Sequence, residues 1–227
     1  MGGVDEYWFL GDFVAIGHDP VGVLEQITHL SGARYLRGNT DRYIYTGELP
    51  WPQFADVTKE PALAQLHIQV ARSFSWTSGA VSASGWLPWV KELPLELRLI
   101  LPDGTKVLAV HAAPGTDDGA GISTTTSDEA LFERVSDVEE GLVLVGHTHR
   151  PFDRTAGNIR VVNPGSISNP LPPDLRASYA ILEAHKNGYT IRHRRVDYDR
   201  EAVIKAVQEV NHPAFEYITR FMKGEIT

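Results

Sequence analysis

The sequence predicts an α/β fold in which short apolar strands alternate with helices around a parallel sheet. Apolar runs of strand length at 7–10 and 33–37 each lead into a glycine followed by a polar side chain, Asp12 in one case and Asn39 in the other. A segment of helical periodicity lies between these two runs. A strand, a helix and a second strand in this order indicate a parallel pair.

The helix between the two strands has both of its end signals. Asp19 can accept hydrogen bonds from free amides of the first turn, and Pro20 suits the first helical position. Apolar residues then recur at helical spacing at Val23, Leu24, Ile27 and Leu30. Gly32 is typical of a helix end, so the helix is expected to stop there.

The remaining elements follow from the same patterns. The turn sequences at 102–104 and 187–188 predict two hairpins, because glycine adopts positive φ without strain. The predicted strands are 97–101, 106–110, 142–145, 159–162, 177–182 and 189–196, and the predicted helices are 127–135 and 200–210. A helical excursion covers about 51–92, and 1–227 is expected to form a single domain.

Composition limits the classes of function. The formal charge of -8 and the pI near 5.6 argue against an extended nucleic-acid surface. The absence of cysteine excludes thiolate metal sites, so a metal would use imidazole, carboxylate or amide ligands. No apolar run reaches transmembrane length and no signal peptide is recognisable, so we expect a cytoplasmic protein without membrane contact. The sequence does not indicate an oligomeric state.

Polar side chains that can bind a metal follow four separate strands. They are Asp12, Asn39, His111, and the pair His147 and His149. Ligands at one rim of an α/β sheet converge on one crevice. Oxygen and imidazole donors suit manganese, iron, zinc or nickel, and a carboxylate can bridge two such ions in a hydrolase. Asp12 is the best candidate for the bridge.

Five short motifs in this chain resemble those of calcineurin-like metallophosphoesterases, in the same order. They are Gly11-Asp12 with Asp19-Pro20, Gly38-Asn39-Thr40-Asp41, Val110-His111, Gly146-His147-Thr148-His149 and Val162-Asn163-Pro164-Gly165-Ser166. The chain is most similar in pattern to the small bacterial and archaeal phosphodiesterase branch. The resemblance implies a two-sheet β-sandwich flanked by helices, and a small phosphate-ester substrate.

The same resemblance implies roles for individual residues. Two divalent transition metals are expected, one held by Asp12, Asn39, His111 and His147, and the other by Asp12 and His149 with two further ligands from an Asp-x-His motif. The residues implied in catalysis are Asp12, Asn39, Asp41 and His111. Those implied in substrate binding are Thr40, Asn163 and Ser166.

The Asp-x-His motif of the family does not occur in this sequence. In the family it ends a strand that precedes the strand at 7–10, so we expect the native chain to extend upstream by about one strand and one helix. Without that segment the second metal site is incomplete. Glu183-Ala184-His185 has similar spacing and is a less favoured substitute.

A second departure is Thr40, which stands where many relatives carry a histidine that protonates the leaving group. A threonine hydroxyl has no useful pKa for this role. Asp41, His18 or metal-bound water could supply the proton instead, or the substrate could have a good leaving group.

Other conspicuous residues have ordinary explanations. We interpret His29, His67, His193 and His212 as surface or packing residues, and Trp51, Trp76, Trp86 and Trp89 as packing of the helical excursion. The leading hypothesis for function is a metal-dependent phosphodiesterase. The alternatives are a dinucleoside polyphosphate hydrolase or protein phosphatase, and a catalytically impaired metal-binding scaffold.

Overall fold

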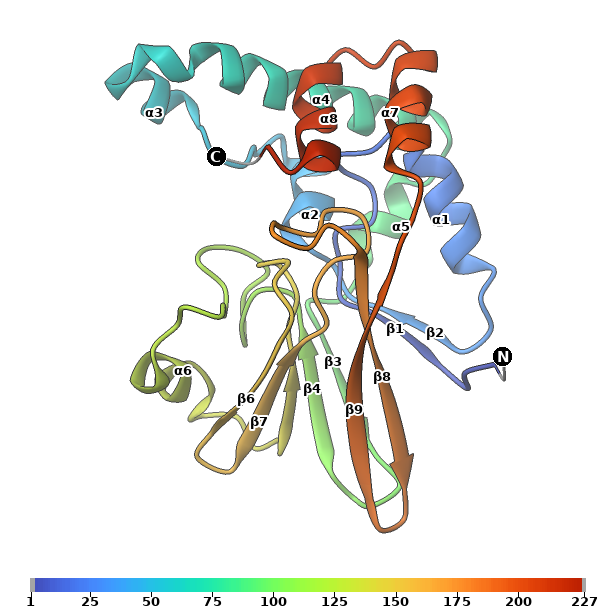
Figure 1. The fold of residues 1–227 in the computed structure, drawn as a ribbon, viewed down its shortest axis with the longest axis vertical. Helices are drawn as coiled ribbons and strands as arrows, with labels where there is room; N and C mark the ends of the chain where they lie inside the picture. The colour runs from blue at the N-terminus through green and yellow to red at the C-terminus, as the bar shows by residue number, and fades with distance from the viewer. Residues whose placement is uncertain (1–2, 226–227) are drawn as a thin grey trace.

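The structure, a computed structural model, describes residues 3–225 as a sandwich of short sheets with helices gathered at one end (Figure 1). Its elements in chain order are β1 (Tyr7–Phe9), α1 (Pro20–Thr28), β2 (Ala33–Tyr35), α2 (Asn39–Thr46), α3 (Phe54–Lys59), a 3-10 turn (Pro61–Leu63), α4 (Ala64–Ala83), α5 (Leu87–Lys91), β3 (Glu96–Ile100), β4 (Lys106–Val110), α6 (Asp128–Val135), β5 (Leu142–Leu144), β6 (Phe152–Ala156), β7 (Ile159–Asn163), β8 (Ala177–His185), β9 (Gly188–Val196), α7 (Arg200–Glu209) and α8 (Phe215–Lys223).

The predicted unit of strand, helix and strand is confirmed at the start of the chain. Strands β1 and β2 pair in parallel, with Tyr7 opposite Ala33. Asp19 caps α1, since its carboxylate accepts the Gly22 N–H at 2.8 Å. Pro20 occupies the first helical position, as predicted. The unit therefore delivers Gly11 and Gly38 to the same edge of the pair.

The central sheet has five strands in the order β3-β4-β5-β7-β6. Strands β4, β5 and β7 run parallel to one another, whereas β3 and β6 are antiparallel edge strands. The predicted β3–β4 hairpin is confirmed. Strand β6 was not predicted, because only Phe152 and Ala156 of its five residues are buried and its charged residues hide the strand pattern.

Both faces of the central sheet are covered, as a sandwich requires. One face packs against α6 through Leu131 and Val135. The other face packs against the β8–β9 hairpin, which contributes Leu182 and Ile191. Trp8 of β1 joins the same cluster. The predicted mixed α/β sandwich is thus confirmed, with a second layer that consists of two separately paired pieces, β1–β2 and β8–β9.

A third cluster joins the helices to the β1–β2 pair. Helices α2, α4, α7 and α8 gather at one end of the molecule (Figure 1), and their buried residues include Ile44, Val70, Val207 and Ile218. Trp89 packs against Tyr35 of β2, with 5.3 Å between the two ring centroids. Within residues 3–225, neither α4 nor any shorter helix combines the length and apolarity that a membrane crossing needs.

The connection between α7 and α8 carries a buried histidine that should make stability depend on pH. His212 packs against Trp76 in a tilted arrangement with 4.4 Å between ring centroids, and its Nδ1 accepts the Ala214 N–H at 3.1 Å. Burial lowers the pKa of His212 to about 4, with a smaller contribution from the charge of His18. This interaction places His18 beside His212.

Because the folded pKa lies below the unfolded value of about 6.5, His212 should lower stability as the pH falls from about 6.5 towards 4. His212→Asn keeps an acceptor for the Ala214 amide and removes the titrating group. Urea unfolding at pH 7 and pH 5 should therefore show a smaller loss of stability in His212→Asn than in the wild type. Equal losses in the two proteins would contradict the prediction.

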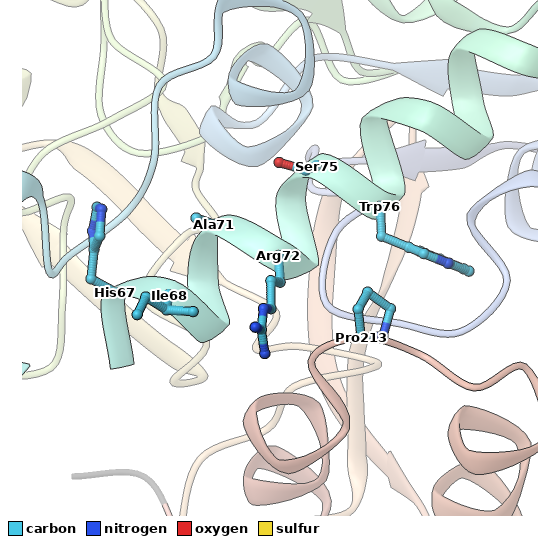
Figure 2. A pocket seen from close by; sticks show the side chains of 7 residues that line it. All are labelled: His67, Ile68, Ala71, Arg72, Ser75, Trp76 and Pro213. Carbon is cyan, nitrogen blue, oxygen red and sulfur yellow. The ribbon is translucent and has the colours of Figure 1, made fainter. Parts of the chain in front are cut away.

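A broad groove runs along α4 on the side that faces the α7–α8 connection. Its volume is about 600 Å³, and Figure 2 shows Trp76 and Pro213 on one side of it and His67 and Ile68 towards the other end. None of the residues predicted to carry chemistry lines this groove. The chemistry predicted from the sequence therefore belongs to another part of the molecule.

Candidate metal centre

The polar residues that follow β1, β4 and β5 meet at one edge of the sandwich, together with the start of α2. The Nε2 atom of His111 lies 3.3 Å from Asp12 Oδ2 and 3.2 Å from Asn39 Oδ1. The Nδ1 atom of His147 lies 3.2 Å from the same Asn39 oxygen. The structure thus brings together the four residues that were predicted to hold the first metal.

Backbone carbonyls orient both imidazoles. His111 Nδ1 is 2.5 Å from the Leu10 carbonyl oxygen, and His147 Nε2 is 2.8 Å from the Gly119 carbonyl oxygen. A carbonyl accepts hydrogen bonds but cannot donate, so the nitrogen that faces it carries the proton. In the neutral rings the other nitrogen, which faces Asn39, is then free to bind a cation.

The spacing of the four inward atoms fits a cation at their centre. Donors bound to zinc at about 2.0–2.1 Å in a tetrahedral arrangement lie about 3.3 Å apart. Three of the six spacings between these atoms match that value: His111 Nε2 to Asp12 Oδ2 at 3.3 Å, and Asn39 Oδ1 to each imidazole at 3.2 Å. Acceptors held at such distances without a shared proton or cation would repel one another, so the donor set fits one divalent transition metal.

The amide of Asn39 is essential to this set. Counting His, Asp and Glu alone, residues 3–225 contain no group of three that would hold a metal ion. Asn39 is buried, at 6% exposure, and its single oxygen lies opposite both imidazoles. It stands in the first turn of α2, not in the loop that the sequence suggested.

The charges in the cluster are strongly coupled. Burial would raise the pKa of Asp12, but the nearby His111 and the hydrogen bonds from His111 and Thr40 hold it well below its usual range. Burial is the largest single influence on His111 and would lower its pKa, but the charge and hydrogen bond of Asp12, the Leu10 carbonyl and the charge of Asp41 together raise that pKa to about 9. Metal binding would require His111 to lose its proton, so protons and a metal would compete for this cluster.

The second metal set is less complete. His149 is close enough to Asp12 for the carboxylate to oppose the lowering of the His149 pKa that burial causes. Glu183 and His185, the suggested substitutes, do not approach it. Glu183 pairs with Arg192 on β9, and His185 adjoins the hairpin turn at the end of the molecule away from α2 and α4 (Figure 1).

Asp41 ties the two loops of the centre together. It is fully buried, and its oxygens accept the N–H groups of Gly38, Asp12 and Phe13, each at 2.8 Å. Burial, together with the charge of Asp12, raises the pKa of Asp41 to about 7 against the opposing effect of those amides. Its contacts are those of a positioning residue, and its role as a proton donor stays a prediction.

Thr40 holds Asp12 in place. Its hydroxyl donates to Asp12 Oδ1 at 2.7 Å, and its backbone N–H reaches the same oxygen at 3.1 Å. The side chain is buried, at 8% exposure for the residue. Thr40 therefore leaves Asp12 Oδ2 to face His111, and direct substrate binding by Thr40 stays a prediction.

The motif at 162–166 supports the histidine loop. Asn163 is fully buried, and its Nδ2 donates to the Gly146 carbonyl at 2.7 Å and to Thr148 Oγ1 at 3.1 Å. Ser166 Oγ accepts the Asn169 N–H at 3.0 Å. These contacts shape the loop, whereas substrate binding by Asn163 and Ser166 stays a prediction.

Three site residues adopt left-handed backbone conformations, which side chains rarely do. The φ angles are 63° at Asp12, 63° at His147 and 58° at His149. Residues two apart on a straight strand would share one face, and Thr148 would point away from both. The left-handed turns instead allow His147 to face Asn39 while His149 stays close enough to interact with the charge of Asp12.

Sequence reasoning missed the contributions of backbone carbonyls and of a loop between β4 and α6. Leu10 and Gly119 act through carbonyl oxygens, which leave no side-chain signal. Asp117 binds Arg37 at 2.7 Å and Arg42 at 3.2 Å, which anchors the loop that carries Gly119. The acidic run in this loop was the available signal for that anchor.

A smaller pocket of about 210 Å³ opens beside His149. Its lining comes from the segments that follow β4, β5 and β7 and from the β8–β9 hairpin. These residues are Thr124, His149, Arg150, Pro151, Pro170, Leu171, Pro172, Pro173, Asp174, Arg176, Ser178 and Arg195. The pocket provides space for a ligand beside His149.

Solved structures share this fold. A hypothetical protein from Pyrococcus horikoshii superposes with a TM-score of 0.79 at 20% identity, over 97% of this chain and 85% of that one. A metallophosphoesterase from Sphaerobacter thermophilus superposes with a TM-score of 0.72 at 24% identity, over 99% of this chain and 90% of that one. At these identities the likeness shows the fold alone. No curated protein is similar enough to be matched.

The family comparison covers most of the chain. The model of the calcineurin-like phosphoesterase superfamily domain matches residues 1–187, which include every residue of the metal centre. The motifs in order, the sandwich and the convergent ligands agree with this match. The chain therefore belongs to the calcineurin-like phosphoesterase superfamily.

Proposed function

We propose that this protein is a metal-dependent phosphodiesterase that acts on small phosphate esters. Membership of the superfamily supports phosphoester hydrolysis and divalent metal binding in general. The observation that carries the proposal is the set of four inward-facing atoms from Asp12, Asn39, His111 and His147, at spacings of 3.2–3.3 Å. A bound divalent ion would lower the pKa of a water molecule and offset charge on the phosphate.

The residues of this chain would fix the geometry of the reaction. Asp12 is held by Thr40 and by its coupling to His111, and the two imidazoles are held by backbone carbonyls. Because these side chains are already oriented, little reorganisation is needed when substrate arrives. The same donors suit zinc, manganese, iron or nickel, and we propose two such ions, the second bound by Asp12 and His149 with further ligands.

The tilt towards diesters rests on the resemblance to the small phosphodiesterase branch, and the surroundings of Asp12 add a preference for good leaving groups. The hydroxyl of Thr40 donates its hydrogen to Asp12. The oxygens of Asp41 already accept three backbone N–H groups, so Asp41 is not clearly placed to protonate a leaving group. Leaving groups that need no proton should therefore react fastest. Aryl diesters such as bis-p-nitrophenyl phosphate meet this condition, and alkyl monoesters do not.

We predict that the rate of diester hydrolysis falls steeply as the pKa of the leaving group rises. The measurement is kcat/KM with added Mn²⁺ across a series of aryl methyl phosphates, with His147→Ala as the control for contaminating activity. A flat dependence, with the chemical step shown to limit the rate, would overturn the assignment of Thr40. Turnover should be lost in His147→Ala across the series.

A scaffold without catalysis is the second candidate, because Asp12 and His149 alone bind a second ion weakly. This candidate predicts metal binding without turnover of any ester. The same preparation of protein decides between the two, since elemental analysis measures the metal and the ester series measures the chemistry. The dinucleoside polyphosphate and protein phosphatase alternatives are tested by adding those substrates to the series.

A further inference from the structure

The pocket beside His149 has an unusual charge for this molecule. Three arginines and one aspartate line it, which gives 3 - 1 = +2, whereas the whole chain carries -8. Asp197 also attracts Arg176 from outside the lining, so an excess of at least 3 - 2 = +1 remains. A positive excess in a cleft of an acidic protein favours an anionic ligand.

The arginines are held in place by contacts that leave donors free. Arg176 binds Asp174 through two hydrogen bonds of 2.9 and 2.7 Å, and Arg195 binds the same carboxylate. These two guanidiniums hold the pKa of Asp174 well below its usual range, with Arg176 the larger influence. Each guanidinium carries five N–H groups, so one shared carboxylate cannot satisfy both.

Arg150 adds a further charge, and within residues 3–225 no carboxylate forms a salt bridge with it. Its Nη1 donates at 3.0 Å to the carbonyl oxygen of Pro172, which carries no formal charge. Arg150 directly follows His149, so the pocket and the metal centre share a boundary. The Pro170–Pro173 wall is stiff, because proline fixes its φ angle, and it holds the position of Arg150.

The size of the pocket suits a small group. Sites for drug-sized ligands span about 300–1,000 Å³, and this pocket has about 210 Å³. Arginine pairs with phosphate through two parallel hydrogen bonds, which gives both charge and direction. The lining therefore fits one phosphate group better than a nucleobase or an apolar side chain.

We infer that this pocket binds a second phosphate group of the substrate, next to the phosphate that reacts, through Arg150, Arg176 and Arg195. The inference rests on the proposed function and narrows its substrate class to phosphodiesters that carry an additional phosphate. After hydrolysis, the reacted phosphate and the additional phosphate would either stay on the same product or lie on separate products. The pocket contributes to affinity and orientation, and the metal centre carries out the hydrolysis.

Two substrates that differ only in the additional phosphate test this inference. They are p-nitrophenyl thymidine 5′-phosphate and the same ester with a 3′-phosphate, which share one leaving group. The wild type is expected to favour the bisphosphorylated ester by roughly tenfold or more in kcat/KM, mostly through KM. Arg150→Gln and Arg176→Gln should each reduce this ratio towards one. Arg192→Gln, an exposed arginine on β9, removes the same charge elsewhere and should keep the ratio.

A binding measurement separates failure of the pocket from failure of the proposed function. Calorimetric titration with thymidine 3′,5′-bisphosphate and with thymidine 5′-phosphate needs no turnover. Tighter binding of the bisphosphate, lost in Arg150→Gln, supports the pocket even if neither ester is hydrolysed. Hydrolysis of both esters with a ratio near one in the wild type, or equal binding of the two nucleotides, overturns the pocket and leaves the diesterase standing.

Discussion

Replacing His147 with alanine is expected to lower the affinity of this protein for a divalent transition metal at least as much as the ~10- to 100-fold typical of outer-sphere changes. The reason is geometric. His147 Nδ1 lies 3.2 Å from Asn39 Oδ1, and it is one of the four donors predicted for the first metal. Elemental analysis after dialysis against a series of buffered metal concentrations measures the affinity.

His29→Ala is the matched control for this loss. His29 is exposed at the end of α1 and its ring hydrogen-bonds to the local carbonyl of Glu25, so its removal should leave metal content unchanged. Urea unfolding of both variants separates a lost ligand from a lost fold. Equal metal occupancy in His147→Ala and the wild type would show that the centre is assigned to the wrong residues.

Asp41→Ala should have the second large effect, on stability. The substitution leaves the buried amides of Gly38, Asp12 and Phe13 without their acceptor. Each unsatisfied buried donor costs about 1–3 kcal/mol. Removal of the charge also relieves the repulsion from Asp12 that raises the pKa of Asp41. We expect a net loss of about 2 kcal/mol or more, measured by urea unfolding in the presence of a chelator.

The comparison is with Asp19→Ala, which removes the same side chain from an exposed helix cap. Asp19 accepts one amide, that of Gly22, so its loss should cost about 1 kcal/mol. The chelator ensures that metal binding does not contribute to either value. A loss in Asp41→Ala no larger than that in Asp19→Ala would mean that the two loops do not depend on this carboxylate.

The parts of the fold that could be predicted are those with local signals. The Asp19 cap, the glycine turns and the apolar strands act within a few residues, so β2 and β4 were found close to their observed bounds and α1 begins where it was predicted. The end of α1 was placed too late, because the helix stops at Thr28 and not at Gly32. Helix α2 was missed because its first turn coincides with the motif at 38–41. There Asp41 accepts the Gly38 amide, which starts a helix where a loop was expected.

The candidate site divides in the same way. Its side-chain ligands could be predicted because each follows a recognisable strand, and the structure brings Asp12, His111 and His147 together with Asn39. The carbonyls that orient the imidazoles have no residue-type signature. The arginine pocket was missed because Arg150 and Arg195 are distant in sequence and meet only when the hairpin folds over the histidine loop.

The left-handed backbone at Asp12, His147 and His149 has a consequence for how this protein tolerates change. An ordinary side chain in that conformation costs roughly 1–2 kcal/mol, and glycine is free of most of this cost. Glycine at any of these positions would relieve local strain while deleting a ligand. Selection for heat resistance alone would therefore favour glycine at these positions and so remove metal ligands. Stabilising variants of this protein should be sought at other positions.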